Sequence, residues 1–108
     1  MKIYKVSIKP ESWRETVTLR FNDRPGVSAI IAAIQTWIDE YENARDNPDS
    51  DELDRDVAGD KVREYGEIIE LLQAARGIEL PFDVNRITVA GTAVGVIMFD
   101  AGEEVFAA

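Results

Sequence analysis

A run of apolar residues at helical spacing constrains this chain more than any other feature. Seven residues recur three and four places apart: Val27, Ile30, Ile31, Ile34, Trp37, Ile38 and Tyr41. One face of an α-helix collects residues at that spacing, and Pro25 suits a first helical turn, where an N–H has no partner. Asn47-Pro48 ends the pattern, because the residue before proline is pushed out of the α region. We therefore predict a helix over about 25–46, with Asp23 as its cap.

The segments before this helix have the pattern of half-buried strands. Residues 2–9 and 15–21 alternate apolar and polar side chains with a period of two. A turn that includes Pro10 separates them, so we predict an antiparallel hairpin. The polar side chains expected on its solvent face are Lys5, Lys9, Thr18 and Arg20. The basic residues thus line one side of the predicted sheet.

A second helix is predicted after an acidic loop. Residues 47–59 are expected to form this loop or a weak extra helical turn, and the helix proper begins with Asp60 as its N-cap and ends at Gly77. Gly66 stands inside this helix and indicates close packing against a neighbour, since glycine otherwise weakens a helix.

The last part of the chain returns to strand composition. Residues 94–99 are apolar on both faces, which predicts a central strand covered by helices on one side and by another element on the other. Gly91 or Gly95 is expected to mark a turn or a bulge. A turn over 100–103 and a short strand over 104–106 would follow.

Together these elements predict a single α+β domain over residues 1–108. The expected architecture is an antiparallel sheet of four to five strands with two helices packed on one face. The order is β-β-α-α-β-β, and the fifth strand would be the short final one.

Charge and missing residue types exclude several classes of protein. The chain has 12 basic and 21 acidic residues, a formal net charge of −9, which argues against direct binding of nucleic acid. It has no cysteine and no histidine, so it lacks a thiol nucleophile, an imidazole base and the usual zinc ligands. We expect no cofactor and no metal. The apolar run over 87–99 is too short to span a bilayer, which takes about 18 residues. We read no targeting signal, and a cytoplasmic setting fits best.

Carboxylates alone do not form a recognisable site in this sequence. Residues 47–58 begin like an EF-hand loop, but Glu52 stands where the turn needs glycine and Ala58 where a glutamate should close the shell. A glycosidase needs two acids about 5–9.5 Å apart across a cleft, whereas the acids here fall in polar segments. The stretch GTAVG has neither the lysine of a P-loop nor the glycine spacing of a dinucleotide turn. We therefore expect a protein without enzymatic activity.

Residues 39–56 hold nine carboxylates and two arginines in eighteen positions, and three interpretations of them compete. The segment is a solvated helix end and loop that keeps the protein soluble. Or it is an assembly surface that pairs with a basic face, either of another copy or of a partner. Or it imitates nucleic acid, because carboxylates three and four places apart on a helix lie about 5–6 Å from one another, a spacing comparable to that of successive phosphates.

The imitation hypothesis rests on two acidic rows at helical spacing. The first row is Asp39, Glu42, Asp46 and Asp49, and the second is Asp60, Glu64, Glu67 and Glu70. The loop between them adds Asp51, Glu52, Asp54 and Asp56. Residues 1–24, by contrast, hold six basic and three acidic residues, so the molecule should be electrically polar.

Trp13 and Arg14 lie together on the predicted hairpin turn and have two interpretations. Tryptophan and arginine are typical hot-spot residues of interfaces. Alternatively, Trp13 folds back over the sheet as a lid on the core, which we favour because tryptophan is mostly buried in proteins.

A small acidic domain without cofactor apparatus resembles phage-encoded inhibitors of host nucleases and defence complexes in composition and size. No family motif covers the chain. The resemblance implies an inhibitor or regulator that mimics nucleic acid. We predict that the acidic residues of the two rows and the loop, apart from Glu70, bind a partner protein together with Trp13 and Arg14, and that the basic surface of this partner holds nucleic acid. The alternative is a homo-oligomeric structural module whose acidic and basic faces pair.

Overall fold

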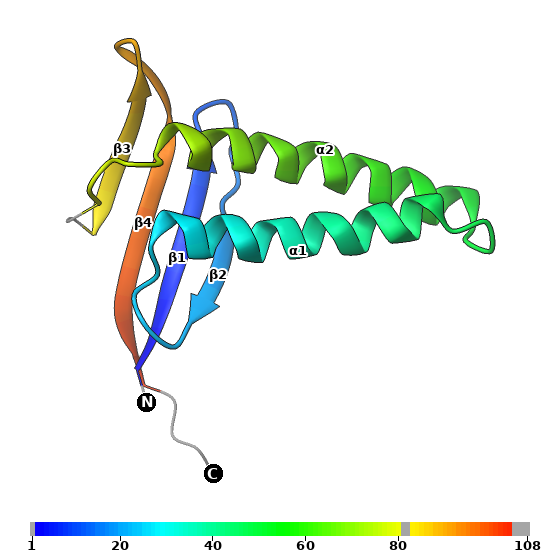
Figure 1. Cartoon of the computed structure of the whole chain (residues 1–108), viewed down its shortest axis with the longest axis horizontal. Helices are drawn as coiled ribbons and strands as arrows, with labels where there is room; N and C mark the ends of the chain where they lie inside the picture. Colours follow the sequence, from blue (N-terminus) through cyan, green and yellow to red (C-terminus); the bar gives the residue numbers. More distant parts are fainter. Residues whose placement is uncertain (1, 81–82, 105–108) are drawn as a thin grey trace.

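Four strands and two helices follow one another in the order β-β-α-α-β-β, which confirms the predicted α+β fold. The computed structural model describes residues 2–80 and 83–104 (Figure 1). The strands are β1 (Lys2–Pro10), β2 (Val17–Phe21), β3 (Val84–Val89) and β4 (Thr92–Glu104), and the helices are α1 (Val27–Asp46) and α2 (Glu52–Ala74). The strands form one antiparallel sheet in the order β2-β1-β4-β3, so β1 and β4 are central.

The predicted hairpin of β1 and β2 is confirmed. Ser7 lies opposite Thr18 and Val6 opposite Leu19 in an antiparallel register. Val6, Ile8 and Leu19 are buried on the helix side. Successive side chains of a strand point to opposite faces, so the basic and polar residues between them lie on the other face, as predicted.

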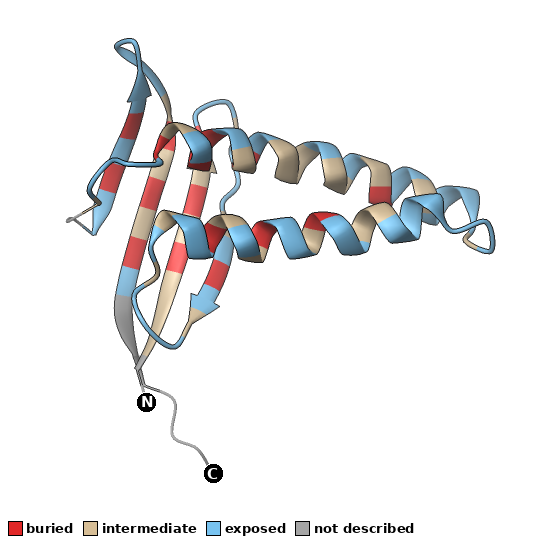
Figure 2. Ribbon diagram, viewed as in Figure 1, coloured by how far each residue is buried: buried red, intermediate tan, exposed pale blue. Residues whose placement is uncertain are grey.

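Both helices cover the same face of the sheet (Figure 1), and the core lies between the two layers. The strands contribute Val6, Ile8, Leu19, Ile87, Ile97 and Phe99, the helices contribute Ile30, Ile34, Ile38, Ile68, Leu71 and Leu72, and Ala75 follows directly after α2. The apolar stripe that predicted the first helix therefore supplies one side of this core. Figure 2 shows the buried positions gathered where the helices cross the strands.

Helix α1 ends at Asp46, as predicted, but its N-cap is Gly26 and no side chain caps it. The expected cap at Asp23 is therefore wrong. The chain between β2 and α1 places glycine, not aspartate, at the last extended residue before the helix.

Helix α2 begins at Glu52 and not after Asp60, so the acidic loop predicted over 47–59 is confined to residues 47–51. Asp51 has the extended backbone of an N-cap, and Glu52 and Asp54 stand in the first turn. Negative side chains stabilise that end of a helix through its dipole, so the acidic segment favours the helix that we expected it to interrupt.

The turn between β3 and β4 places Ala90 and Gly91 at positive φ, 51° and 81°, as a two-residue turn of the primed type requires. The pairing shifts between Ile87 and Thr88, next to Gly95. Gly91 thus marks a turn and Gly95 adjoins a bulge, as expected. An added Cβ at Gly66 would meet nothing within 4 Å, so the close packing predicted there is wrong.

Strand β4 continues to Glu104 and pairs with β1 from Gly95 to Glu104, with a shift in register between Ile3 and Lys5. The turn predicted over 100–103 is therefore wrong, because pairing with β1 keeps this polar segment extended. Of the predicted final strand over 104–106, residues 105 and 106 lie outside the described residues. Val96 and Met98 alternate with buried Ile97 and Phe99 and face away from the helices. Within 2–80 and 83–104, no second layer covers that face.

The molecule is wider than a compact domain of this size. Its radius of gyration is 15.5 Å, against about 13 Å for a compact domain of about 100 residues. Figure 1 shows the reason: the hairpin of α1 and α2 crosses the sheet and extends well beyond β2. Roughly the far half of the hairpin therefore packs only on itself.

Candidate binding surface

The projecting end of the helical hairpin carries most of the acidic residues of the candidate site. Residues 39–64 contain eleven acidic and four basic residues. They include the C-terminal part of α1, the connecting loop and the N-terminal part of α2. The charge excess thus gathers on the part of the hairpin that lies beyond the sheet (Figures 1 and 2).

A few apolar contacts hold the projecting helices together. The Tyr65 ring lies 5.5 Å from the Trp37 ring and 5.8 Å from the Tyr41 ring, centroid to centroid. Nearer the tip, Ala58 is buried, and a Cβ built on Gly59 would lie 3.7 Å from Cδ of Arg45. Aromatic pairs at these separations add about 0.5–1.5 kcal/mol each beyond their buried area. Small residues then let the helices stay close toward the tip.

Hydrogen bonds to the backbone fix the loop at the tip. The backbone N–H of Asp49 donates to Oδ1 of Asn47 over 3.0 Å. Arg55 donates from Nε to the carbonyl of Asn47 over 3.2 Å and from Nη2 to the carbonyl of Pro48 over 2.7 Å. Arg55 thereby ties the start of α2 to the carbonyls of the two residues that follow α1, and the Asn47 carbonyl also accepts from the backbone N–H of Ser50 over 3.2 Å. The loop is short and held in place, so the acids around it have a defined position.

The structure separates the predicted site residues into three places. Asp39, Glu42 and Asp46 lie along α1, whereas Asp49 lies in the loop and does not continue that row. Four further acids lie at the N-cap and in the first turns of α2. The tip set consists of Asp49, Asp51, Glu52, Asp54 and Asp56, which we call the acidic tip. Asp60, Glu64 and Glu67 lie farther along α2, where Glu67 meets Trp13.

The two acidic rows lie on opposite flanks of the hairpin. Tyr41 and Tyr65 face each other between the helices. At about 100° per residue, Glu42, Asp46 and Asp39 lie roughly 100°, 140° and 160° around α1 from Tyr41. By the same count, Glu64, Asp60 and Glu67 lie roughly 100°, 140° and 160° around α2 from Tyr65, in the opposite sense. The rows do not form one double-stranded face, so the geometry expected of a two-row nucleic-acid mimic is absent.

Three exposed ion pairs neutralise part of the charge on the helices. Arg45 contacts Asp46 at 3.2 Å, Lys61 contacts Glu64 at 3.5 Å, and Arg63 contacts Asp60 at 3.4 Å. The hydrogen bond and charge of Asp46 raise the pKa of Arg45, and the charge of Glu64 raises the pKa of Lys61. Such exposed pairs contribute little to stability. In the described part of the chain, no residue of the acidic tip forms an ion pair within 4 Å.

Leu53 and Val57 are exposed among these acids, and the sequence analysis missed them. The exposed fractions are 73% for Leu53 and 49% for Val57. They stand four residues apart on α2 and so share one side of it. The signal was present, since an apolar pair at that spacing within 52–59 is typical of a helix. The tip is therefore an acidic surface with an apolar centre.

Trp13 folds back onto the molecule, as the favoured interpretation held. It packs against the hydrophobic core, and its Nε1–H donates to Oε2 of Glu67 over 2.7 Å. Two shallow hollows adjoin it, of about 270 and 260 Å³; both are lined by Trp13, Glu15 and Glu64. Arg14 lines the first of them. Trp13 and Arg14 thus lie beside the α2 row and far from the acidic tip.

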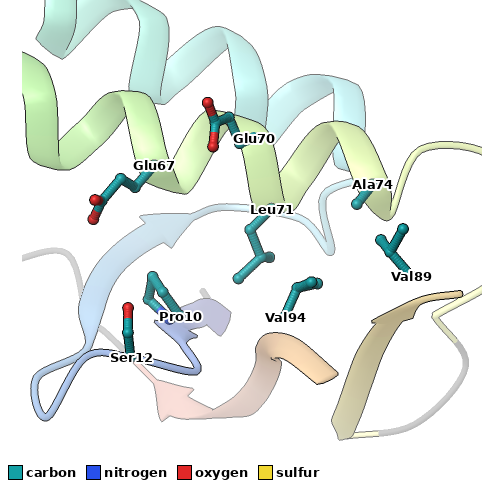
Figure 3. Close-up of a pocket in the computed structure, with 8 residues that line it drawn as sticks. All are labelled: Pro10, Ser12, Glu67, Glu70, Leu71, Ala74, Val89 and Val94. Atoms are coloured by element: carbon teal, nitrogen blue, oxygen red, sulfur yellow. The ribbon is translucent and has the colours of Figure 1, made fainter. Parts of the chain in front are cut away.

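A third hollow, of about 380 Å³, lies on the other side of the Trp13 turn, between α2 and the turn of β3 and β4 (Figure 3). Leu71, Ala74, Val89 and Val94 give it an apolar lining, with Glu67 and Glu70 on the helix above. Figure 3 shows the Glu70 carboxylate pointing away from these apolar side chains. The carboxylates therefore stand at the rim of the hollow and do not face each other across it.

No group of three or more acidic side chains among the described residues is placed to hold a metal ion. Nor is any helix of residues 2–80 and 83–104 both long and apolar enough to cross a bilayer. In comparisons with known proteins, no family model, no curated protein and no solved structure matches the chain.

Proposed function

We propose that this protein is a non-enzymatic binding protein that uses the acidic end of its helical hairpin to engage a basic surface of a partner protein. One observation carries the proposal: the acidic tip projects beyond the sheet and surrounds two exposed apolar side chains, Leu53 and Val57. Such a surface offers charge for attraction and apolar area for affinity. We place the interaction in the cytoplasm, the setting that a cysteine-free chain favours.

The composition of the tip defines the partner that would fit it. A basic surface is attracted to the five tip carboxylates, which raises the rate of encounter and makes it sensitive to salt. An apolar patch inside that basic surface would bury Leu53 and Val57, and burial yields roughly 25 cal/mol per Å² of apolar area. A surface that binds nucleic acid supplies the positive charge, so the protein would act as an inhibitor or regulator of such a partner. Because the two rows diverge, we assign the contact to the tip.

Charge reversal at the tip tests this function. The variant carries Asp49→Lys, Asp54→Lys and Asp56→Lys, and it serves as bait beside the wild type in quantitative pull-downs at low and high salt. We expect the partner recovered with the wild type to be lost from the variant. We also expect salt to weaken wild-type binding, since about 1 M salt shortens the Debye length to about 3 Å.

The matched control changes the same amount of charge elsewhere. Glu11, Glu79 and Asp83 are exposed and lie outside the hairpin, so Glu11→Lys, Glu79→Lys and Asp83→Lys should leave partner recovery unchanged. A third bait with Asp39→Lys, Glu42→Lys and Asp46→Lys separates the α1 row from the tip. If the tip variant retained every partner of the wild type, the proposed function would be wrong.

A further inference from the structure

The face of the sheet that the helices leave uncovered has the opposite chemistry to the acidic tip. It carries the basic residues Lys5, Lys9, Arg20 and Arg86, which alternate with core residues along their strands. It also carries one carboxylate, Asp100, which lies opposite Lys5. Uncovered faces of antiparallel sheets are usually polar and solvated. This one has Val96 and Met98 at its centre and Val84, 58% exposed, at its edge. We call the four basic and three apolar residues the open face.

The strand register places these residues in cross-strand rows. Val96 of β4 lies between Lys9 of β1 and Arg86 of β3. In the next row, Met98 lies between Ser7 and Val84. Directly opposite residues on one face of a sheet have Cβ atoms about 4.5–5.5 Å apart. Met98 is therefore a neighbour of Val84 across the strands, Val96 is next to Met98 on the same side of β4, and Lys9 and Arg86 flank Val96. The open face is therefore an apolar patch with a basic rim.

The acidic tip is the complement of this patch, and its orientation also fits a sheet. Leu53 and Leu71 are 18 residues apart, which is five turns of α2, so both lie on the same side of the helix. At the sheet end, that side packs on the strands through Leu71. At the tip the same side carries Leu53 and has no sheet of its own chain beneath it (Figure 1). A second sheet with a basic rim would fill that place.

We infer that the acidic tip of one copy docks on the open face of a second copy, with Leu53 and Val57 against Val96 and Met98 and the tip carboxylates against Lys9 and Arg86. This inference rests on the proposed function, because it names a second copy as a partner of the same tip. The two surfaces differ, so the contact is heterologous. A docked pair still has one free tip and one free open face, which either extend the assembly as a chain or pair with each other and close it as a ring of two or more copies.

Complementation between two variants tests the heterologous contact. The tip variant carries Leu53→Lys and Val57→Lys, and the face variant carries Lys9→Glu and Arg86→Glu. In low salt we expect the wild type to assemble above the 12.1 kDa of one chain, and each variant alone to be monomeric in analytical ultracentrifugation. The 1:1 mixture should give a dimer of twice that mass and nothing larger, because it contains one intact tip and one intact open face.

Several results would overturn the inference. These are a wild type that stays monomeric in low salt, a single variant that assembles as the wild type does, or a mixture that remains monomeric. The control variant Glu79→Lys changes an exposed acid between α2 and β3, outside the acidic tip and the open face, and should assemble as the wild type. Circular dichroism melts of each variant establish that the substituted chains are folded.

Disulfide trapping gives a second measurement that does not depend on breaking the contact. The chain has no cysteine, so Leu53→Cys in one protein and Met98→Cys in the other introduce the only thiols. Mild oxidation of their mixture should yield a disulfide-linked heterodimer, whereas Glu79→Cys mixed with Met98→Cys should not. Equal yields from both mixtures would contradict the inference.

The outcomes also separate this inference from the proposed function. The second-copy contact is overturned and the proposed function stands if the wild type stays monomeric while the charge reversal at Asp49, Asp54 and Asp56 removes a basic partner. If copies assemble through the tip while its charge reversal leaves every other partner bound, the tip serves self-assembly alone.

Discussion

The two ends of helix α2 present the same residue type on the same side of the helix and use it differently. Leu71 is 4% exposed and packs over the sheet, whereas Leu53, five turns away, is 73% exposed. The difference lies in what is beneath the helix: strands at one end, and nothing of this chain beyond β2 at the other (Figure 1). Packing in the core therefore requires an apolar side chain at position 71, whereas folding sets no such requirement at position 53.

Leucine truncation at the two positions should show the largest contrast. Leu71→Ala removes a buried side chain from the core, and we expect it to lower the free energy of unfolding by about 2–5 kcal/mol. Leu53→Ala should change it by less than about 0.5 kcal/mol, as substitutions at exposed sites do. Urea denaturation of both variants measures this. Equal losses would mean that the tip is part of the same packed core.

Substitution of Gly95 and of Gly66 compares a tightly packed site with an open one. A Cβ at Gly95 would collide with Cδ1 of Leu71 and would lie 2.7 Å from the carbonyl oxygen of Lys9 and 3.1 Å from Cα of Pro10. The backbone atoms cannot move aside cheaply, so Gly95→Ala should cost about 1–3 kcal/mol. Gly66→Ala meets open space within a helix and should stabilise the protein by about 0.5–1 kcal/mol.

A double variant distinguishes the atoms responsible for the cost at Gly95. In the Leu71→Ala background the nearest clash is absent, so the two losses should not add. If Gly95→Ala were neutral in either background, the close approach of α2 to the sheet at this glycine would be wrong.

Arg55 tests how the projecting end is held. Arg55→Ala removes both side-chain bonds to the carbonyls of Asn47 and Pro48. A hydrogen bond of this kind contributes about 0.5–1.5 kcal/mol, and at the tip the loss should appear as local opening rather than global unfolding. Amide hydrogen exchange should become faster near residues 52–58 and remain unchanged in β1 and β4. Faster exchange throughout the chain would show that the tip and the core unfold together.

Most of the fold could be predicted from the sequence, because periodicity reports burial and burial decides this architecture. The stripe from Val27 to Tyr41 and the alternation around Val6 and Leu19 identify the faces that pack. The predicted start of α2 is wrong, because the many charged residues of segment 47–59 indicated a solvated loop, whereas α2 begins at Glu52. The Leu53 and Val57 spacing and the acidic first turn, both local signals, favour the helix that forms there.

The candidate site could be predicted only in composition. The acids were expected in polar, exposed segments, and most of them are exposed. Their sides of the helices depend on where Tyr41 and Tyr65 meet. The divergence of the two rows follows from that contact and from no pattern along the chain. Likewise, the alternation of Lys5 and Lys9 predicts a basic face, whereas the position of Val96 between Lys9 and Arg86 depends on pairing between β1, β4 and β3.

The smallest expected effect concerns Tyr65, where the sheet-covered and projecting parts of the hairpin meet. Burial raises the pKa of Tyr65, since the phenolate loses hydration there, and neighbouring Tyr41 acts in the same direction. A folded-state pKa above the unfolded value of about 10 means that stability is complete below pH 10 and falls as pH rises through the folded value. Deprotonation of Lys61 also lowers stability as pH rises, because the charge of Glu64 raises the pKa of Lys61 in the folded protein. Tyr65→Phe should therefore make the alkaline decline in the free energy of unfolding shallower without abolishing it. Urea denaturation from pH 8 to 11 measures the slope, and an identical slope in both proteins would show that Tyr65 is as solvated as a residue of the exposed tip.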